Sequence, residues 1–183
     1  MNGEILDMLD TDTHLSAISG IQVEVKLGLS VEINQMPNIA DDGVSFDHTT
    51  QDFDFVPDSG KGYFRRFQMR TQSGEIDTEM VGDVGVYGYK HKLVGFIPKG
   101  GIVQNKFINN IKNRMLILLV TENGGTVKNI GTKGIPAYLK VAKYNSGKQV
   151  GDVPGPGWNV EFHADAIDPP YIYTGTPKIE PNP

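Results

Sequence analysis

The chain has 183 residues, a formal net charge of −5 at pH 7 and no cysteine, which predicts a single domain without disulfides or thiolate chemistry. Its acidic balance argues against an ordinary nucleic-acid-binding protein, because such proteins present a basic face to phosphate groups. The longest apolar run, Met115–Val120, is far shorter than the roughly 20 residues that span a bilayer, so we expect no membrane-spanning helix.

The start of the chain predicts an N-terminal arm over residues 1–19. Apolar residues between Ile5 and Leu9 are followed by a polar interruption, which indicates weak helical character. The acidic start also predicts no secretory leader. From residue 21 the period changes, and apolar and polar residues alternate over 21–29. This alternation predicts a half-buried strand that opens a single β domain over residues 20–174.

The segment that follows, residues 37–62, is polar and rich in turn-forming residues, with short apolar islands. A loop of about 25 residues is uncommon inside a compact domain unless it has a function. We therefore predict a long loop or loose hairpin that contacts a neighbouring subunit. The candidate contact residues are Asp41, Asp42, Phe46, Phe53 and Phe55.

Three strands are predicted next, over residues 63–71, 75–81 and 86–98. In the second strand, side chains two apart share a face, so its three carboxylates point the same way. A turn at Asp83-Val84 would set Glu75 opposite Lys92 and Asp77 opposite Lys90. Either this face is a solvated hairpin surface with incidental pairing, or the carboxylates form an acidic wall toward a channel or partner. The three carboxylates are Glu75, Asp77 and Glu79.

The rest of the chain alternates strands and turns around one helix. Apolar residues spaced three and four apart predict a helix over residues 104–114, and the continuous apolar run after it predicts a strand buried on both faces. The proline-rich residues 175–183 predict a peripheral tail. With 22 glycines and 11 prolines as punctuation, we expect a mostly β fold, a sandwich or half-barrel with one flanking helix. The further strands are predicted at residues 127–130, 135–144, 158–164 and 171–173.

No motif for catalysis, cofactor binding or metal binding stands out. The four histidines lack the spacing of a metal site, and His163 with Asp165 would supply too few ligands. Phosphate-loop and nucleophile-elbow motifs are missing. The run Tyr63–Phe67 interleaves aromatic and basic residues, as single-stranded nucleic-acid platforms do. We favour core aromatics with outward arginines, and we expect no enzyme activity and no cofactor.

A series of short segments supports a more specific hypothesis. Their order resembles that of the tail tube, or major tail, proteins of long-tailed bacteriophages and prophages, and the resemblance covers roughly residues 64–174. The segments are Thr78–Asp83, Gly95–Pro98, Met115–Val120, Asn123–Gly125, Gly131–Ala137, Ser146–Lys148, Trp158–Phe162 and Pro169–Tyr171.

This resemblance implies a structural subunit that self-associates into rings, usually of six, which stack into a hollow tube for DNA passage. It implies a location in the virion tail after assembly in the host cytoplasm, with no membrane partner. The implied partners are identical copies and other tail proteins, namely the terminator, baseplate, tape measure and sheath. We expect Glu75, Asp77 and Glu79 on the inner hairpin of the ring, where an acidic wall would keep DNA from binding tightly.

Two alternatives stay open. Another virion part, such as a connector, tail terminator or hub protein, would have a similar composition. A monomeric β-sandwich that binds carbohydrate is the other alternative, and it would need a planar aromatic platform. The candidates for such a platform are Trp158, Tyr171 and Tyr173.

Overall fold

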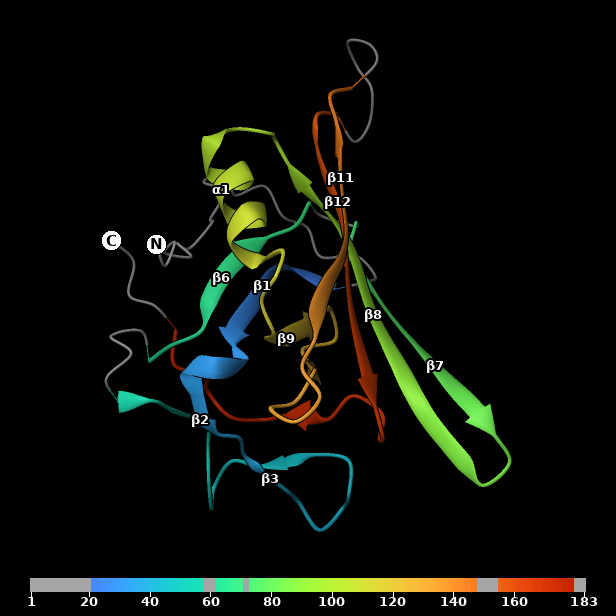
Figure 1. The fold of residues 1–183 in the computed structure, drawn as a ribbon. Coiled ribbons are helices and arrows are strands. Elements are labelled where there is room, and N and C mark those ends of the chain that lie inside the picture. Colours follow the sequence, from blue (N-terminus) through green and yellow to red (C-terminus); the bar gives the residue numbers. More distant parts are fainter. Residues whose placement is uncertain (1–20, 58–61, 71–72, 148–154, 180–183) are drawn as a thin grey trace.

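The computed structural model describes residues 21–57, 62–70, 73–147 and 155–179. The arm predicted over residues 1–19 lies outside them. The described chain is mostly β with a single α-helix, α1 (Ile102–Ile111), as Figure 1 shows. The mostly β fold class with one helix is therefore confirmed.

Two antiparallel sheets pack face to face as a sandwich, and two short strand pairs lie beside them. The five-stranded sheet runs in the order β13 (Ile172–Tyr173), β10 (Val127–Ile130), β9 (Leu116–Glu122), β1 (Ile21–Leu29) and β6 (Arg65–Gln68). The four-stranded sheet runs in the order β11 (Tyr138–Asn145), β12 (Gly157–Ala166), β8 (Val86–Pro98) and β7 (Glu75–Asp83). The short pairs are β2 (Ile33–Gln35) with β5 (Asp54–Phe55) and β3 (Asn38–Ile39) with β4 (Phe46–Asp47), and a 3-10 turn, η1 (Ser30–Glu32), precedes β2.

The helix closes one end of the core between the two sheets. Phe107, Ile108 and Ile111 are its buried residues, so the predicted apolar face is the one that packs. The ring of Phe107 lies 5.1 Å from that of Phe67 in β6. The helix begins and ends a few residues earlier than the sequence pattern predicts, because residues 112–115 turn the chain into β9.

Strand β9 separates two hydrophobic cores. Leu116, Leu118 and Val120 face the core between the sheets, whereas Ile117 and Leu119 face a second core on the outer side of the five-stranded sheet. All five side chains are fully buried. The prediction of a strand buried on both faces is therefore confirmed. The apolar run is continuous because each face of β9 packs against a hydrophobic core.

The long segment after β2 covers this second core. Phe46 and Phe55 are buried in it, and Phe53 packs edge-on against Phe64 with ring centroids 5.0 Å apart. These three phenylalanines, predicted to contact a neighbouring subunit, instead contact the chain's own sheet, because Ile117 and Leu119 would otherwise face water.

The exposed tip of the same segment carries the two aspartates. Asp41 and Asp42 are both exposed. Asp42 stabilises the turn, since its Oδ1 accepts hydrogen bonds from the backbone N–H groups of Val44 and Ser45, each at 2.9 Å. Hydrogen bonds from Ser45 and Val44 lower the pKa of Asp42 below its usual value. A contact between this tip and a neighbouring subunit stays a prediction.

The aromatic and basic run at β6 is part of the protein interior. Phe64 and Phe67 are fully buried, as expected for core aromatics. The expectation of outward arginines is wrong for Arg65, which is buried and donates two hydrogen bonds to the Glu32 carboxylate, at 2.6 and 3.1 Å. A buried guanidinium needs such a partner, because its desolvation is costly. The run therefore presents no stacking platform to nucleic acid.

The described part of the predicted tail, residues 175–179, returns to the domain. The backbone N–H of Phe64 donates a 2.7 Å hydrogen bond to the Lys178 carbonyl, and Ile179 forms a parallel bridge with Phe64. This contact places residue 179 beside the start of β6. Residues 180–183 lie outside the described part of the chain.

Candidate functional site

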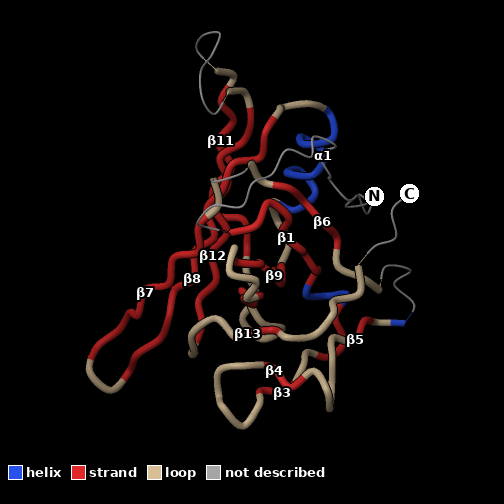
Figure 2. The backbone as a smooth tube through the Cα atoms, turned by 180° about the vertical axis from the view of Figure 1, so that it is seen from behind, coloured by secondary structure: helices blue, strands red, loops and turns tan. Residues whose placement is uncertain are grey.

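The β7–β8 hairpin extends well beyond the sandwich, as both views of the backbone show (Figures 1 and 2). Its far end is a two-residue turn, in which Asp83 pairs with Val86 across Val84 and Gly85. Gly85 has a φ of +91°, a left-handed conformation that glycine adopts without the steric cost of a Cβ atom. Sequence and geometry thus agree that this is a tight hairpin.

The register of the hairpin corrects the predicted charge pairs. Asp77 lies opposite Lys92 and Glu79 opposite Lys90, whereas Glu75 lies opposite Val94. The predicted pairing of Glu75 with Lys92 and of Asp77 with Lys90 is wrong, because the turn centre lies at Val84-Gly85, one residue later than expected. A one-residue move of the centre shifts the pairing by two residues, so every side chain keeps its face.

The three predicted carboxylates lie together on the outer face of the four-stranded sheet, and all three are exposed. The same face continues into β12 with Glu161 and Asp165, since their cross-strand neighbours in β8 are Val94 and Lys90. Lys92 Nζ lies 4.0 Å from Glu161 Oε2. The face therefore mixes both charges, with more carboxylates than ammonium groups.

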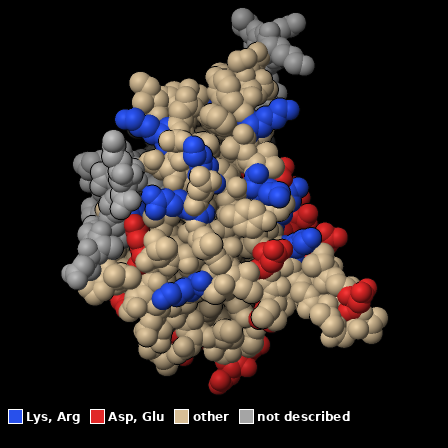
Figure 3. Space-filling view, viewed as in Figure 1, with Lys and Arg blue, Asp and Glu red and all other residues tan. Residues whose placement is uncertain are grey.

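The two edges of this sheet carry opposite charge. Strand β7 lies at one edge and has the sequence EIDTEMVGD, with four acidic and no basic residues. Strand β11 lies at the other edge and has the sequence YLKVAKYN, with two lysines and no acidic residue. Both lysines, Lys140 and Lys143, are exposed. In Figure 3 basic side chains gather over the upper part of the molecule, and acidic ones lie toward the hairpin and the lower end.

Neither edge strand pairs with a further strand in the described residues. An unpaired edge presents a row of backbone N–H and C=O groups that can accept another strand. The two edges are nearly equal in length, nine residues in β7 and eight in β11. Sequence reasoning identified the acidic strand but missed Lys140 and Lys143, because the sequence alone does not show which strands lie at the edges of a sheet.

The hairpin tip is apolar as well as exposed. Val84 is 91% exposed and Val86 79%, and neighbouring Met80 and Tyr87 are about half exposed. An apolar cluster at the end of a projecting element is typical of a surface that another molecule covers. The apolar character of this tip is visible in the sequence, since two valines flank the turn glycine.

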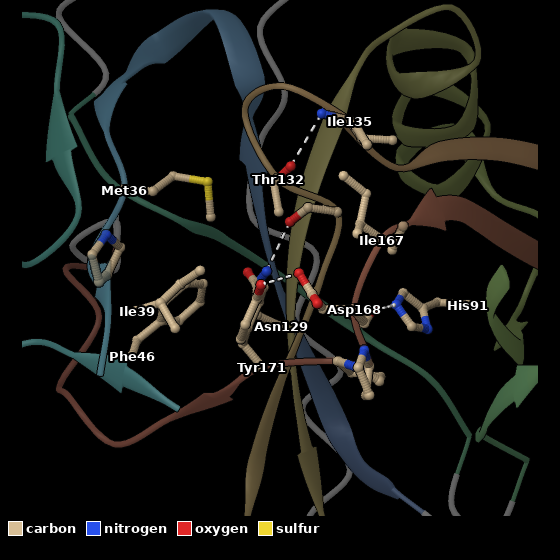
Figure 4. A pocket seen from close by; sticks show the side chains of 15 residues that line it. Met36, Ile39, Phe46, His91, Asn129, Thr132, Ile135, Ile167, Asp168 and Tyr171 are labelled. Atoms are coloured by element: carbon tan, nitrogen blue, oxygen red, sulfur yellow. Dashed lines mark hydrogen bonds between the residues drawn. The ribbon is translucent and has the colours of Figure 1, made fainter. Parts of the chain in front are cut away.

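A pocket of about 260 Å³ lies near the base of the hairpin, where the four-stranded sheet meets the long segment (Figure 4). His91 on β8 is buried there, with Nε2 3.1 Å from the Asp168 carbonyl and Nδ1 3.2 Å from Thr78 Oγ1. Burial lowers the pKa of His91 below its usual value. The Tyr171 hydroxyl donates a 2.6 Å hydrogen bond to Asp168, and burial together with this carboxylate raises the pKa of Tyr171 to about 12.

The proposed carbohydrate platform does not form. Trp158 packs beside the core between the sheets and donates a hydrogen bond to Asn105 Oδ1. Tyr171 and Tyr173 are buried in the second core, on the other side of β9. The three rings therefore belong to two separate clusters and share no plane that a sugar could cover.

Within residues 21–57, 62–70, 73–147 and 155–179, no three side chains of the metal-binding types gather into a site. Over the same ranges, no helix combines the length and apolar character needed to cross a membrane. No family model, curated protein or solved structure matches the chain.

Proposed function

We propose that this chain is a structural subunit that assembles into closed rings by pairing β7 of one copy with β11 of the next. The observation that supports this proposal is that the two free edges of one sheet are matched in length and opposite in charge. Such a contact joins two different surfaces of the same chain, and contacts of this kind generate rings when the rotation closes.

The strand directions suit this pairing. Neighbouring strands along β11, β12, β8 and β7 are all antiparallel, so β7 runs opposite to β11 within one chain. A rotation about an axis near the strand direction preserves each strand's direction. The β7 strand of one copy would therefore meet β11 of the next in antiparallel fashion, and the alternation would continue around the whole ring.

The resemblance to phage tail tube proteins extends this proposal. By that analogy the rings would contain six copies and stack into a tube that DNA crosses, with the other tail proteins at its ends and the virion tail as its location. Glu75, Asp77 and Glu79 would then lie toward the lumen. Because lysines share their face and salt screens charges beyond about 8–10 Å, this wall would weaken phosphate binding only at close range.

Reversing the charge of one edge tests the edge pairing. Lys140→Glu with Lys143→Glu places like charges at the proposed interface. Each cross-strand pair contributes roughly 0.2–1 kcal/mol, so turning two attractive pairs into repulsive ones costs about 1–4 kcal/mol per interface. This cost corresponds to association that is roughly 4-fold to 1,000-fold weaker. Sedimentation velocity would measure the association, and negative-stain electron microscopy would show whether rings or tubes form.

The control has the same charge change elsewhere. Lys106→Glu with Lys112→Glu alters two exposed lysines at α1 that belong to neither edge strand, and should leave association unchanged. Adding Glu75→Lys to the β11 variant should restore part of the association, because Glu75 lies opposite Val94 and its reversal sets no lysine against it within the chain. Equal association of the β11 variant and the control would refute the edge pairing.

A further inference from the structure

Three exposed apolar residues lie side by side near the starts of β9 and β11. The Ser30 backbone N–H donates a 2.9 Å hydrogen bond to the Met115 carbonyl, which brings Val31 next to Met115. An antiparallel bridge between the residue after Met115 and the residue before Tyr138 sets these two beside each other. Val31 is 72% exposed, Met115 62% and Tyr138 39%. We call these three residues the apolar strip, and exposed apolar groups with a polar rim are typical of a surface that another segment covers.

The charge around the apolar strip is basic. Arg114 precedes it in the sequence before β9, and Lys140 follows it on β11. Over residues 99–147 the sequence has eight lysines and arginines but only one acidic residue. The Glu32 carboxylate, next in sequence to the strip, is already paired with Arg65, with 2.6 Å between oxygen and nitrogen. The strip therefore fits a segment that combines apolar side chains with carboxylates.

The start of the chain has this composition. Residues 1–20 contain four acidic residues and no lysine or arginine, and apolar residues cluster over Ile5–Leu9. Two other exposed apolar surfaces suit such a segment less well, because each carries a carboxylate of its own. The rim of the pocket at the hairpin base has Asp168, and the hairpin tip has Asp83. Charge complementarity thus favours the apolar strip over both surfaces.

The start of the chain is also long enough to reach the apolar strip of the same molecule. The strip lies near the far end of β1, and the nine residues from Ile21 to Ser30 span about 30 Å at roughly 3.3 Å each. The twelve residues from Leu9 to Ile21 can span about 40 Å when extended. Docking within one molecule is further favoured by an effective concentration in the millimolar range.

We propose that residues 4–10 dock on the apolar strip of their own chain, with the apolar side chains of residues 5–9 covering the strip and the neighbouring carboxylates meeting Arg114 and Lys140. Because Tyr138 is the first residue of β11, the docked segment lies beside one end of the edge that we propose joins copies. The contact forms within one molecule, so this proposal does not rest on the edge pairing.

Disulfide trapping in the full chain tests the contact, because the chain has no cysteine of its own. One double variant carries Leu6→Cys and Met115→Cys. The matched control carries Leu6→Cys and Ile102→Cys, since Ile102 at the start of α1 is 75% exposed and has Lys99 and Lys106 near it in the sequence. Both variants are oxidised in a glutathione redox buffer at a concentration where the chain is monomeric. Non-reducing gel electrophoresis then separates cross-linked monomers from dimers over time.

The Leu6→Cys, Met115→Cys variant should form its disulfide within one molecule at least about tenfold faster than the control, since a disulfide needs Cα atoms roughly 4.4–6.8 Å apart. Equal rates or a faster control would overturn the proposal. Cross-linked dimers in place of cross-linked monomers would also overturn it, because the segment would then bind another copy. Failure of the edge pairing would leave these rates unchanged, since the protein is monomeric in the experiment.

The charges of the segment are tested in the same assay. Asp7→Asn with Asp10→Asn removes two carboxylates from the segment and leaves the folded domain unaltered. Exposed ion pairs contribute roughly 0.2–1 kcal/mol each, so the ratio of the two cross-linking rates should fall by about 2-fold to 30-fold. A ratio that stays unchanged would overturn the proposal, because charge complementarity is what assigns this segment to the apolar strip.

Discussion

In the second core, the contact between Gly28 of β1 and Phe64 allows a quantitative prediction of how substitutions change the free energy of unfolding. Gly28 in β1 has no side chain, and a Cβ atom there would lie 2.9 Å from Phe64 Cε1 and 3.0 Å from Ile33 Cδ1. Both neighbours are fully buried. Gly28→Ala should therefore overpack this site, and overpacking typically costs about 1–3 kcal/mol of the free energy of unfolding.

Phe64→Leu should also destabilise, but for a different reason. The Phe64 ring packs edge-on against Phe53 at 5.0 Å and Phe55 at 5.5 Å. Two such aromatic pairs contribute roughly 0.5–1.5 kcal/mol each, so their loss costs about 1–3 kcal/mol. In the double variant the smaller leucine makes room for the alanine. The combined loss should therefore be smaller than the sum of the single losses by about 1–2 kcal/mol, within the range of coupling between contacting residues.

The free energy of unfolding of each variant is measured by urea denaturation at a protein concentration where the chain is monomeric. An equal dependence of this free energy on urea concentration in all variants would show that their unfolded states are comparable. The matched control pairs Gly28→Ala with Phe107→Leu, which alters an aromatic residue of the other core. This control pair should be additive. Additivity within about 0.5 kcal/mol for the Gly28 and Phe64 pair would refute the packing argument.

Three further predictions concern the ion pair, the hairpin and the buried histidine. Arg65→Met leaves the Glu32 carboxylate without its buried partner and should lower the free energy of unfolding by about 3–5 kcal/mol. Adding Glu32→Leu removes the unpaired carboxylate and should recover part of this loss, as measured by thermal unfolding. A double variant that is less stable than Arg65→Met would contradict this prediction. Gly82→Ala would set a Cβ 2.1 Å from the Val86 carbonyl oxygen, at a residue with a φ of +122°. The amide chemical shifts should therefore change around the hairpin tip, while those of β9 stay fixed. Shift changes that spread through β9 would contradict a purely local effect. Since burial lowers the pKa of His91 in the folded state, the unfolded chain binds the proton more readily, and stability should hold above about pH 6.5 and fall as the pH drops below it. His91→Gln should flatten this fall in urea midpoints measured across pH, and an unchanged pH profile would exclude His91 as its source.

Sequence periodicity predicted the parts of the fold that local patterns control. The strand at residues 86–98 and the strand at 127–130 have the predicted bounds. The apolar run in β9 is buried on both faces, as its lack of alternation indicated. In each case a proline, a glycine pair or the end of an apolar run marks the boundary.

The register of the β7–β8 hairpin and the burial of Arg65 could not be predicted from local sequence patterns. The hairpin turn lies at Val84-Gly85 because Gly85 adopts a positive φ, and two glycines so close together left more than one turn possible. Arg65 is buried because Glu32, far away in the sequence, lies within 2.6 Å of it. A sequence pattern shows that a residue is charged but does not show whether a distant partner will bury it.

The candidate contact surfaces were predictable only in part. The alternating carboxylates of β7 were visible in the sequence, whereas the basic edge at Lys140 and Lys143 required the strand order. The pocket at the base of the hairpin was not predictable, because it forms where β10, the residue 166–171 segment and the long segment meet.

Hydrogen exchange of the full chain tests the edge pairing most directly, by comparing dilute protein with concentrated, assembled protein. Edge completion by identical copies predicts that amides in β7 and β11 exchange freely when dilute and become protected together on assembly, while β9 amides are protected in both states. Protection that stays unchanged in both edge strands when the protein assembles would contradict the claim that these edges join the copies.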